Sequence, residues 1–283
     1  SQEAPFLKET THKRLLSSYI MKEQHIAAVE DRTIKLINLN VYDGGRYLED
    51  VSHYLSAQQP DIVTLQEVYS CENTAAPKRF NTISGLSSCF SNYKLFYSPE
   101  FQIKTEHGDV TVGNAILSRY FISQKKTVFL NGEYAIYPQV NMDPSHYPKN
   151  MQICRLDIPG LPLNLCNLHG IWDRTTKDTE DRFHMVQVIL STLARYDRIV
   201  IAGDFNVSIE TKTMSLMRKK YTQVFDHLSS TLNFNIKDRA KYAPEDNTAV
   251  DMIYTSSNIH IIDKKMPHVD LSDHYPLEIV ISP

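Results

Sequence analysis

The sequence predicts an α/β protein in which two packed β-sheets are flanked by helices. Three observations lead to this prediction. Apolar segments of strand length outnumber the helical patterns, many of these strands are close enough in sequence to pair antiparallel, and few stretches have helical periodicity. The chain has 283 residues, of which 42% are hydrophobic, which is enough for one substantial core. Two sheets with helices outside fit this set of elements best.

The chain opens with a strand, a helix and a second strand. Both alternating faces of residues 33–42 carry apolar side chains, which is typical of a strand buried between layers. Residues 46–57 have apolar residues at i, i+3 and i+7, which predicts a helix. Pro60 ends this helix, and residues 61–69 form a second buried strand.

Strands also dominate the rest of the chain. One further helix is predicted over 179–196, where apolar residues share one face. Residues 131–150 hold several prolines and tyrosines, so we expect a long surface loop, a kind of segment that is often functional. The remaining predicted strands cover 93–98, 111–119, 126–130, 151–158, 163–169, 198–204, 249–255, 259–264 and 275–282.

The polar residues 1–30 predict an N-terminal extension ahead of a single domain over 31–283. The formal net charge of −3 argues against a protein that coats nucleic acid or a membrane surface. No apolar run reaches about 18 residues, so we expect no transmembrane helix. The start at Ser1 fits a secreted protein whose signal peptide was removed and equally a trimmed chain, so the compartment stays open.

The four cysteines do not form a CxxC pair, which makes a zinc knuckle an unfavoured interpretation. Cys154 and Cys166 flank a hairpin turn at equal distance and could face each other across it, although two small buried side chains are the favoured interpretation. Cys71 and Cys89 lie near loops and could form a disulfide in a secreted protein.

Polar residues gather where the apolar strands begin or end, which is where active sites are usually built. An oxygen-rich set of Asn, Glu and Asp side chains suits Mg²⁺, whereas Zn²⁺ would need more His or Cys. Histidines beside carboxylates can donate protons near neutral pH. The set is Asn40, Glu67, His169, Asp204, Asn206, Asp251, Asp273 and His274. Together they predict hydrolysis at phosphorus.

Seven motifs in order resemble the endonuclease/exonuclease/phosphatase (DNase I-like) superfamily. They are NLNVYDG (38–44), LQEVY (65–69), GNAILSR (113–119), NLHGIWD (167–173), GDFNVS (203–208), DMIYTS (251–256) and SDHYPLEIVIS (272–282). The superfamily includes DNase I-like nucleases, abasic-site endonucleases, sphingomyelinases and inositol polyphosphate 5-phosphatases. The resemblance implies a four-layer α/β sandwich with two central mixed or antiparallel sheets, and a catalytic role for the domain over 31–283.

The resemblance also implies a role for each matching residue. Glu67 would be the main Mg²⁺ ligand with Asn40 and Asp273 nearby, and Mn²⁺ would substitute. Asp204, supported by Asn206, would orient or deprotonate the attacking water. The two phosphate-contacting histidines would be His274, oriented by Asp251, and His169. Weaker substrate-binding candidates are Asn114 and Trp172, the latter with core packing as an equal alternative.

Three functions stay open from the sequence. The favoured one is a phosphodiesterase that cuts DNA or RNA, for which the candidate phosphate-contacting cations are Arg46, Arg119, Arg155, Arg174 and Lys177. The second is a phosphatase or phosphodiesterase that acts on a phospholipid or another small phosphate ester, with the tyrosine-rich residues 134–147 as a candidate apolar rim. The third is a non-catalytic binding module. We expect a monomer, and the number of metal ions is left open.

Overall fold

The computed structural model describes residues 33–139, 143–236 and 248–282. The predicted extension over 1–30 lies outside these residues. Within them, thirteen strands form two sheets and four α-helices cover the sheets. None of the described helices is long and apolar enough to cross a membrane.

The first sheet, called sheet A, has seven strands in the order β12-β13-β1-β2-β4-β3-β6. Its strands β1 and β2 are parallel and joined through a helix, whereas β13 and β4 pair antiparallel on either side of them. The strands are β1 (Ile34–Asn40), β2 (Ile62–Cys71), β3 (Lys94–Thr105), β4 (Gly108–Ser118), β6 (Ala135–Tyr137), β12 (His260–Lys265) and β13 (Leu277–Ser282).

The second sheet, called sheet B, has six strands in the order β10-β11-β9-β8-β7-β5. It also contains a parallel pair joined through a helix, β8 and β9, with antiparallel neighbours outside. The strands are β5 (Ile122–Asn131), β7 (Lys149–Leu156), β8 (Leu163–His169), β9 (Ile199–Asp204), β10 (Thr222–Gln223) and β11 (Asp251–Thr255).

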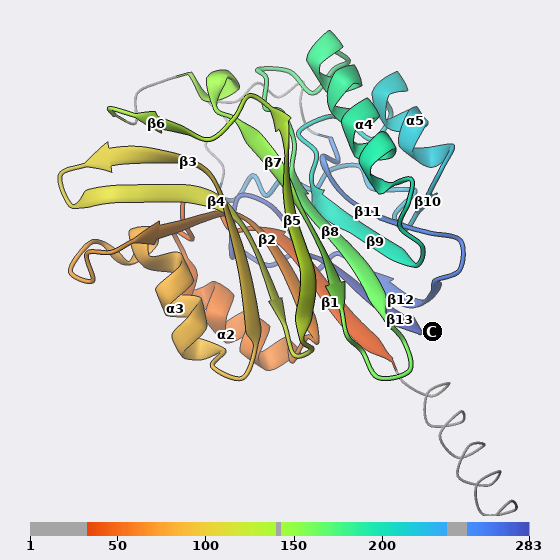
Figure 1. Ribbon diagram of the computed structural model, residues 1–283, viewed down its shortest axis with the longest axis horizontal. Coiled ribbons are helices and arrows are strands. Elements are labelled where there is room, and N and C mark those ends of the chain that lie inside the picture. The colour runs from red at the N-terminus through yellow and green to blue at the C-terminus, as the bar shows by residue number, and fades with distance from the viewer. Residues whose placement is uncertain (1–32, 140–142, 237–247, 283) are drawn as a thin grey trace, which may run out of the picture.

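Helices cover the outer faces of both sheets, so the sandwich has four layers (Figure 1). The helices α2 (Leu48–Gln58) and α3 (Thr82–Cys89) pack on sheet A, and α4 (Glu180–Leu193) and α5 (Lys212–Arg218) pack on sheet B. Two short 3₁₀ helices, η1 (Lys78–Asn81) and η2 (Pro144–His146), lie in connecting segments. The predicted fold class is confirmed.

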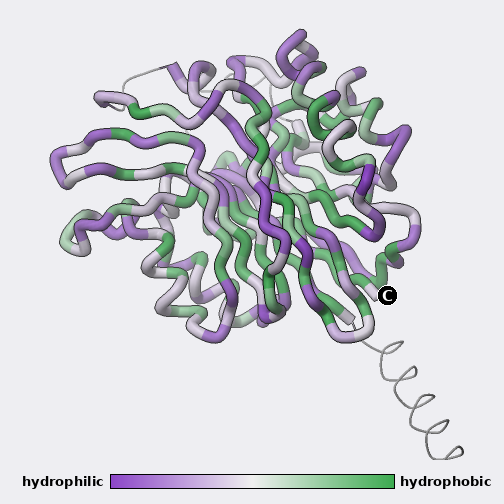
Figure 2. Tube along the Cα trace, viewed as in Figure 1, coloured by the Kyte–Doolittle hydropathy of each residue, from purple (hydrophilic) through white to green (hydrophobic). Residues whose placement is uncertain are grey.

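Each interface between layers has its own apolar core. Residues such as Leu36, Leu165 and Ile253 fill the space between the sheets. A second core joins sheet A to α2 and α3, and a third joins sheet B to α4 and α5. Figure 2 shows the hydrophobic residues concentrated along the central strands. Burial on both faces explains why these strands are apolar on both alternating sets of side chains.

The predicted elements differ from the structure in several places: β3 extends beyond its predicted end at 98, and α5 and β10 were not predicted. The predicted loop over 131–150 contains β6 and η2, because three of its residues pair in parallel with β3. The helix α3 was not predicted: its eight residues include Gly85 and two cap positions without a side-chain hydrogen bond, so its sequence signal is weak. Gly85 allows α3 to approach Leu48 of α2, because a Cβ there would lie 2.9 Å from a Leu48 methyl carbon.

All four cysteines are free thiols. Cys154 pairs with Leu165 and Cys166 pairs with Ile153 across the β7–β8 hairpin, so the two cysteines point to opposite faces of sheet B. Both are buried, one between the sheets and the other beneath α4, as the favoured interpretation predicts.

Candidate active site

The inward faces of the central strands change from apolar to polar at one end of the sandwich. On β1 the inward side chains run from Leu36 to Asn40, and on β8 they run from Leu165 to His169. The parallel units β1–α2–β2 and β8–α4–β9 bring the carboxyl ends of their strands to this same end. The strand ends therefore place polar side chains from both sheets around one point.

Asn40 and Glu67 meet where the first two strands of sheet A carry polar residues. The Glu67 carboxylate accepts a hydrogen bond from Asn40 Nδ2 at 3.0 Å and another from the backbone N–H of Asp43 at 2.7 Å. Asn40 Nδ2 also donates to Asp204 Oδ2 at 3.1 Å, which connects the two sheets. Glu67 has a φ of 59° at a bulge in β2, a strained conformation that the surrounding structure must impose.

The turn after β1 is left-handed over four consecutive residues. Their φ values are 62°, 46°, 76° and 73° for Tyr42, Asp43, Gly44 and Gly45. A Cβ on Gly44 would lie 2.2 Å from the carbonyl oxygen of Arg79, so this position requires glycine for space as well as for its φ. The turn aims the backbone N–H groups of Asp43 and Gly44 at Glu67.

Three of the predicted residues form one row across sheet B. His169 pairs with Asp204, and Asp204 pairs with Asp251, so their side chains lie side by side on the inward face. The backbone N–H of Asn206, which has a φ of 54°, donates to Asp204 Oδ1 at 2.8 Å. Burial, and then the charge of Asp251, raises the pKa of Asp204 to about 6.

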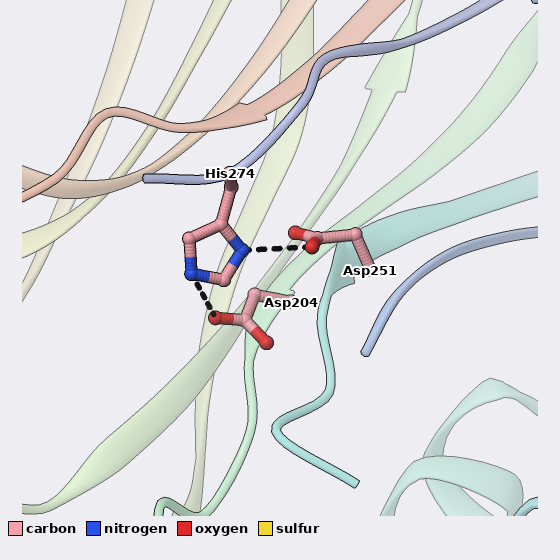
Figure 3. A group of neighbouring side chains, drawn as sticks. All are labelled: Asp204, Asp251 and His274. Atoms are coloured by element: carbon pink, nitrogen blue, oxygen red, sulfur yellow. Dashed lines mark hydrogen bonds and ion pairs between the residues drawn. The ribbon is translucent and has the colours of Figure 1, made fainter. Parts of the chain in front are cut away.

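His274 faces this row from the segment before β13 (Figure 3). Its Nδ1 donates to Asp251 Oδ2 at 2.8 Å, and its Nε2 lies 3.9 Å from Asp204 Oδ2 and 3.8 Å from Asp273 Oδ1. Burial alone would lower the pKa of His274, but the carboxylates of Asp251, Asp273 and Asp204 together raise it to about 10. The imidazole is therefore a cation at neutral pH.

His169 has the opposite electrostatic environment. Burial, followed by the charges of Lys149 and His274, holds its pKa well below the usual value, so this ring is neutral. Lys149 Nζ lies 3.1 Å from Nδ1 and 3.3 Å from Nε2 of His169, and 3.5 Å from the Glu100 carboxylate. Glu100 is fully buried, and burial raises its pKa to about 7 despite the nearby ammonium group.

Glu100 and Lys149 were missed by the sequence reasoning. Glu100 belongs to β3 beyond the predicted end of that strand at 98, next to a bulge between Pro99 and Phe101. Lys149 is the first residue of β7 and follows Pro148, so the sequence assigned it to a surface loop. One signal was present: each charged residue adjoins an apolar strand segment, as Glu67 and Asp204 do.

The remaining predicted residues lie nearby with different surroundings. Asp273 is 5% exposed and precedes His274, and Ser272 Oγ donates to the Asn40 carbonyl at 2.6 Å. Asn114 is fully buried, and its amide donates to Glu100 and to Asn150. Trp172 is half-buried, three residues after His169.

A sequence model described as the Endonuclease/Exonuclease/phosphatase family matches residues 37–274. The chain belongs to this family. Its members are generally metal-dependent phosphoesterases, and the buried carboxylates and histidines at the strand ends are consistent with that chemistry. No curated protein matches the sequence.

Solved structures of the family share this fold. An endonuclease/exonuclease/phosphatase from Beutenbergia cavernae DSM 12333 is 14% identical, with a TM-score of 0.67 over 89% of this chain and 72% of that one. D. rerio TDP2, complexed with a single-strand DNA product, is 16% identical, with a TM-score of 0.64 over 89% and 100% of the two chains. A mannosyl-6-phosphatase from Bacteroides thetaiotaomicron VPI-5482 is 15% identical, with a TM-score of 0.61 over 88% and 100%.

The donor atoms of the site fit a hard divalent cation. Carboxylate oxygens are ligands that Mg²⁺ prefers, and Glu67 and Asp273 supply them, whereas Asn40 turns its amide nitrogen toward Glu67 and its oxygen toward the Tyr42 backbone N–H. Asp204, Asp251 and His274 offer a second set whose ligand atoms lie within 4.8 Å of one another. Among the described residues, Asp251 Oδ1 is buried without a hydrogen-bond partner. A cation would offset this concentration of buried negative charge.

Proposed function

We propose that this protein is a Mg²⁺-dependent phosphodiesterase that acts on DNA or RNA. The observation that carries the proposal is the buried Asp251–His274 pair, which faces Asp204 beside the oxygen donors of Asn40 and Glu67. A general base, a cationic hydrogen-bond donor and ligands for a metal ion are the groups that hydrolysis at phosphorus needs.

The proposed metal ligands are Glu67, Asn40 and Asp273, with Mn²⁺ as a substitute for Mg²⁺. The bound ion would supply positive charge to the phosphate oxygens and stabilise the charge that develops there. We assign Asp204, Asp251 and His274 to catalysis instead, because Nδ1 of the cationic His274 donates its N–H to Asp251 at 2.8 Å and a ring protonated at both nitrogens has no lone pair for a metal ion.

Asp204 is the proposed general base. A pKa of about 6 leaves its carboxylate mostly ionised at pH 7 yet basic enough to accept a proton from the attacking water. Hydrogen bonds from the Asn206 backbone and from the Asn40 side chain fix the orientation of this carboxylate. Asn206 also donates to the Gly170 carbonyl at 3.1 Å, which holds the two adjacent loops together.

The two histidines have different proposed roles because their charges differ. His274 is cationic, so its Nε2–H can donate to a non-bridging phosphate oxygen while Asp251 holds Nδ1. His169 is neutral, and the positive charge beside it comes from Lys149. We therefore propose that Lys149 contacts the phosphate and that Glu100 positions its ammonium group.

Asn114 and Trp172 receive separate proposals. Both hydrogen atoms of the Asn114 amide are directed at Glu100 and Asn150, so we propose that Asn114 positions Glu100 and does not contact substrate. Trp172 is proposed to contact the substrate, because it is half-buried and follows His169 closely.

An exposed apolar edge favours a phospholipid headgroup as the second candidate substrate. Tyr134 is 41% exposed and Ile136 is 57% exposed, and both belong to the segment around β6. β6 pairs with residues 101–103 of β3, directly after Glu100, the partner of Lys149. Apolar side chains in such a place can insert at a lipid interface.

The test is a comparison of substrates with and without Mg²⁺. Supercoiled plasmid, single-stranded oligonucleotides, phosphoinositides and sphingomyelin are incubated with the wild type, with His274→Ala and with His260→Ala, a control at an exposed histidine. We expect Mg²⁺-dependent nicking that His274→Ala loses and His260→Ala retains. Release of a lipid headgroup without nicking would transfer the assignment to phospholipids. Turnover of none of these substrates, together with equal Mg²⁺ binding by the wild type and Glu67→Gln, would refute the proposal.

A further inference from the structure

Two arginines from distant parts of the sequence converge beside the metal-binding carboxylate. Arg46 Nη2 donates to Asp43 Oδ2 at 2.7 Å, and Arg79 Nη1 donates to the same oxygen at 3.1 Å. The other oxygen of Asp43 accepts a hydrogen bond from the hydroxyl of the half-buried Tyr69 at 2.9 Å. The Asp43 backbone N–H donates to Glu67, so a single residue, Asp43, connects both arginines to a proposed metal ligand.

Both guanidinium groups are held in place by aromatic rings as well as by Asp43. The Arg46 guanidinium lies 4.9 Å from the centroid of the Tyr42 ring, and that of Arg79 lies 4.8 Å from the centroid of the Phe80 ring. Stacking on a ring and pairing with a carboxylate fix the plane of a guanidinium group before any ligand binds. Such preorganisation lowers the entropy cost of binding.

The fixed guanidinium groups keep most of their donors available. Each arginine carries five N–H donors and uses one of them on Asp43. The Arg46 and Arg79 side chains are 47% and 42% exposed, whereas Asp43 is 28% exposed with both oxygens occupied. Arg46, Arg79 and Asp43 together carry a net charge of +1, whereas the centre of the site is rich in carboxylates.

Two of the other cations that the sequence suggested for phosphate contact, Arg119 and Arg155, are placed differently. Arg119 lies 3.7 Å from Asp61 at the start of β2, and Arg155 lies 3.3 Å from Asp157 after β7. The β2 end near Asp61 is opposite to the end that carries Glu67. Arg155 likewise lies near the end of β7, whereas the site residue Lys149 is at its start, so both arginines are further along their strands from the site than Arg46 is.

We propose that Arg46 and Arg79 form a second phosphate subsite, which binds the non-reacting phosphate next to the one that is cleaved. Arginine pairs with phosphate oxygens through two parallel N–H donors, and two fixed guanidinium groups side by side match one phosphate. The proposal rests on the proposed function, because it assumes a reacting phosphate at Glu67 and His274. Under this proposal the substrate is a nucleic acid strand that carries a further phosphate next to the one that is cleaved.

The first test compares two substrates that differ only in flanking phosphates. Dithymidine monophosphate has one phosphodiester, whereas oligothymidylate has several. The ratio of their kcat/KM values is measured for the wild type, for the double variant Arg46→Gln/Arg79→Gln and for Arg195→Gln, a control arginine that also lies over a tyrosine ring. We expect the double variant to lower the ratio of kcat/KM for oligothymidylate to that for dithymidine monophosphate about tenfold, because KM for oligothymidylate rises. The control should leave this ratio at the wild-type value.

The second test measures binding without turnover. Anisotropy of labelled oligothymidylate in the absence of Mg²⁺ is followed against salt concentration, and the double variant is expected to reduce the log–log slope by about 0.7 for one lost phosphate contact. The double variant Arg46→Lys/Arg79→Lys keeps the charge and the fold. Its kcat/KM ratio should lie between those of the wild type and the Gln double variant. An unchanged kcat/KM ratio with an unchanged salt slope overturns the subsite. If the wild type turns over neither thymidylate substrate, the nuclease assignment fails, and the binding slope still decides the subsite.

Discussion

Arg182 provides the sharpest test of how the active-site loops are held. The side chain is fully buried in α4 and donates to three backbone carbonyls: Lys177 at 2.7 Å, Asn206 at 2.5 Å and Ile171 at 3.3 Å. All three acceptors lie on the loops that follow His169 and Asp204. Arg182→Met keeps much of the side-chain volume and removes every donor.

The expected loss of stability follows from the acceptors that lose their partner. A buried acceptor left unsatisfied costs about 1–3 kcal/mol, and the Lys177 segment is exposed enough for water to replace its donor. The carbonyls of Ile171 and Asn206 then give a loss of roughly 3 kcal/mol in the free energy of unfolding. For a domain of this size that corresponds to a decrease in Tm of about 6–12 °C.

The assay is urea and thermal unfolding followed by circular dichroism, with Arg195→Met as the matched control. Arg195 lies just after the end of α4 and is exposed, so its substitution should change stability by less than about 0.5 kcal/mol. If Arg182→Met loses no more than about 1 kcal/mol, the reasoning from unsatisfied carbonyls is refuted.

Three further predictions concern the site and its supports. Burial raises the pKa of Glu100 from 4.5 to about 7, so the folded state keeps a proton that the unfolded state releases. The wild type should therefore lose stability as the pH rises through this window, and Glu100→Gln should flatten the slope of urea midpoints against pH; parallel slopes would contradict this. Gly170→Ala would place a Cβ 2.2 Å from the Phe205 carbonyl oxygen, so we expect a loss of about 1–3 kcal/mol in unfolding experiments. Gly85→Ala, whose Cβ meets the end of a flexible side chain, is its control and should lose less. Chelation should abolish turnover and Mg²⁺ restore it, and Glu67→Gln should raise the Mg²⁺ concentration for half-maximal rate at least about tenfold; an unchanged Mg²⁺ titration would remove Glu67 from the metal ligands.

The sequence was informative wherever regular alternation extended to the end of a strand. Asn40 and His169 are the last inward residues of their strands, so counting by twos from the apolar core places them at the site. Asp204 follows the same rule on β9. The motifs in order carried the family resemblance, which implied a four-layer sandwich, and the structure confirms that arrangement.

Sequence reasoning failed where a bulge or a loop changes the direction of a side chain. The bulge next to Glu100 shifts the register of β3, and a bulge cannot be counted from hydrophobic alternation. The pairing of Arg46 with Arg79 depends on η1 folding back over the left-handed turn, a contact between residues 33 positions apart. No local pattern of side chains reports such a contact.

The position of β13 has a consequence for when activity appears during synthesis. Among the described residues β13 is the last strand in chain order, yet it pairs with β1, the first, in the interior of sheet A. The segment just before it supplies Asp273 and His274. While the ribosome still covers this region, β1 lacks one neighbour and Asp251 lacks its imidazolium partner. A nascent chain can therefore assemble most of both sheets before the side chains of this site are brought together.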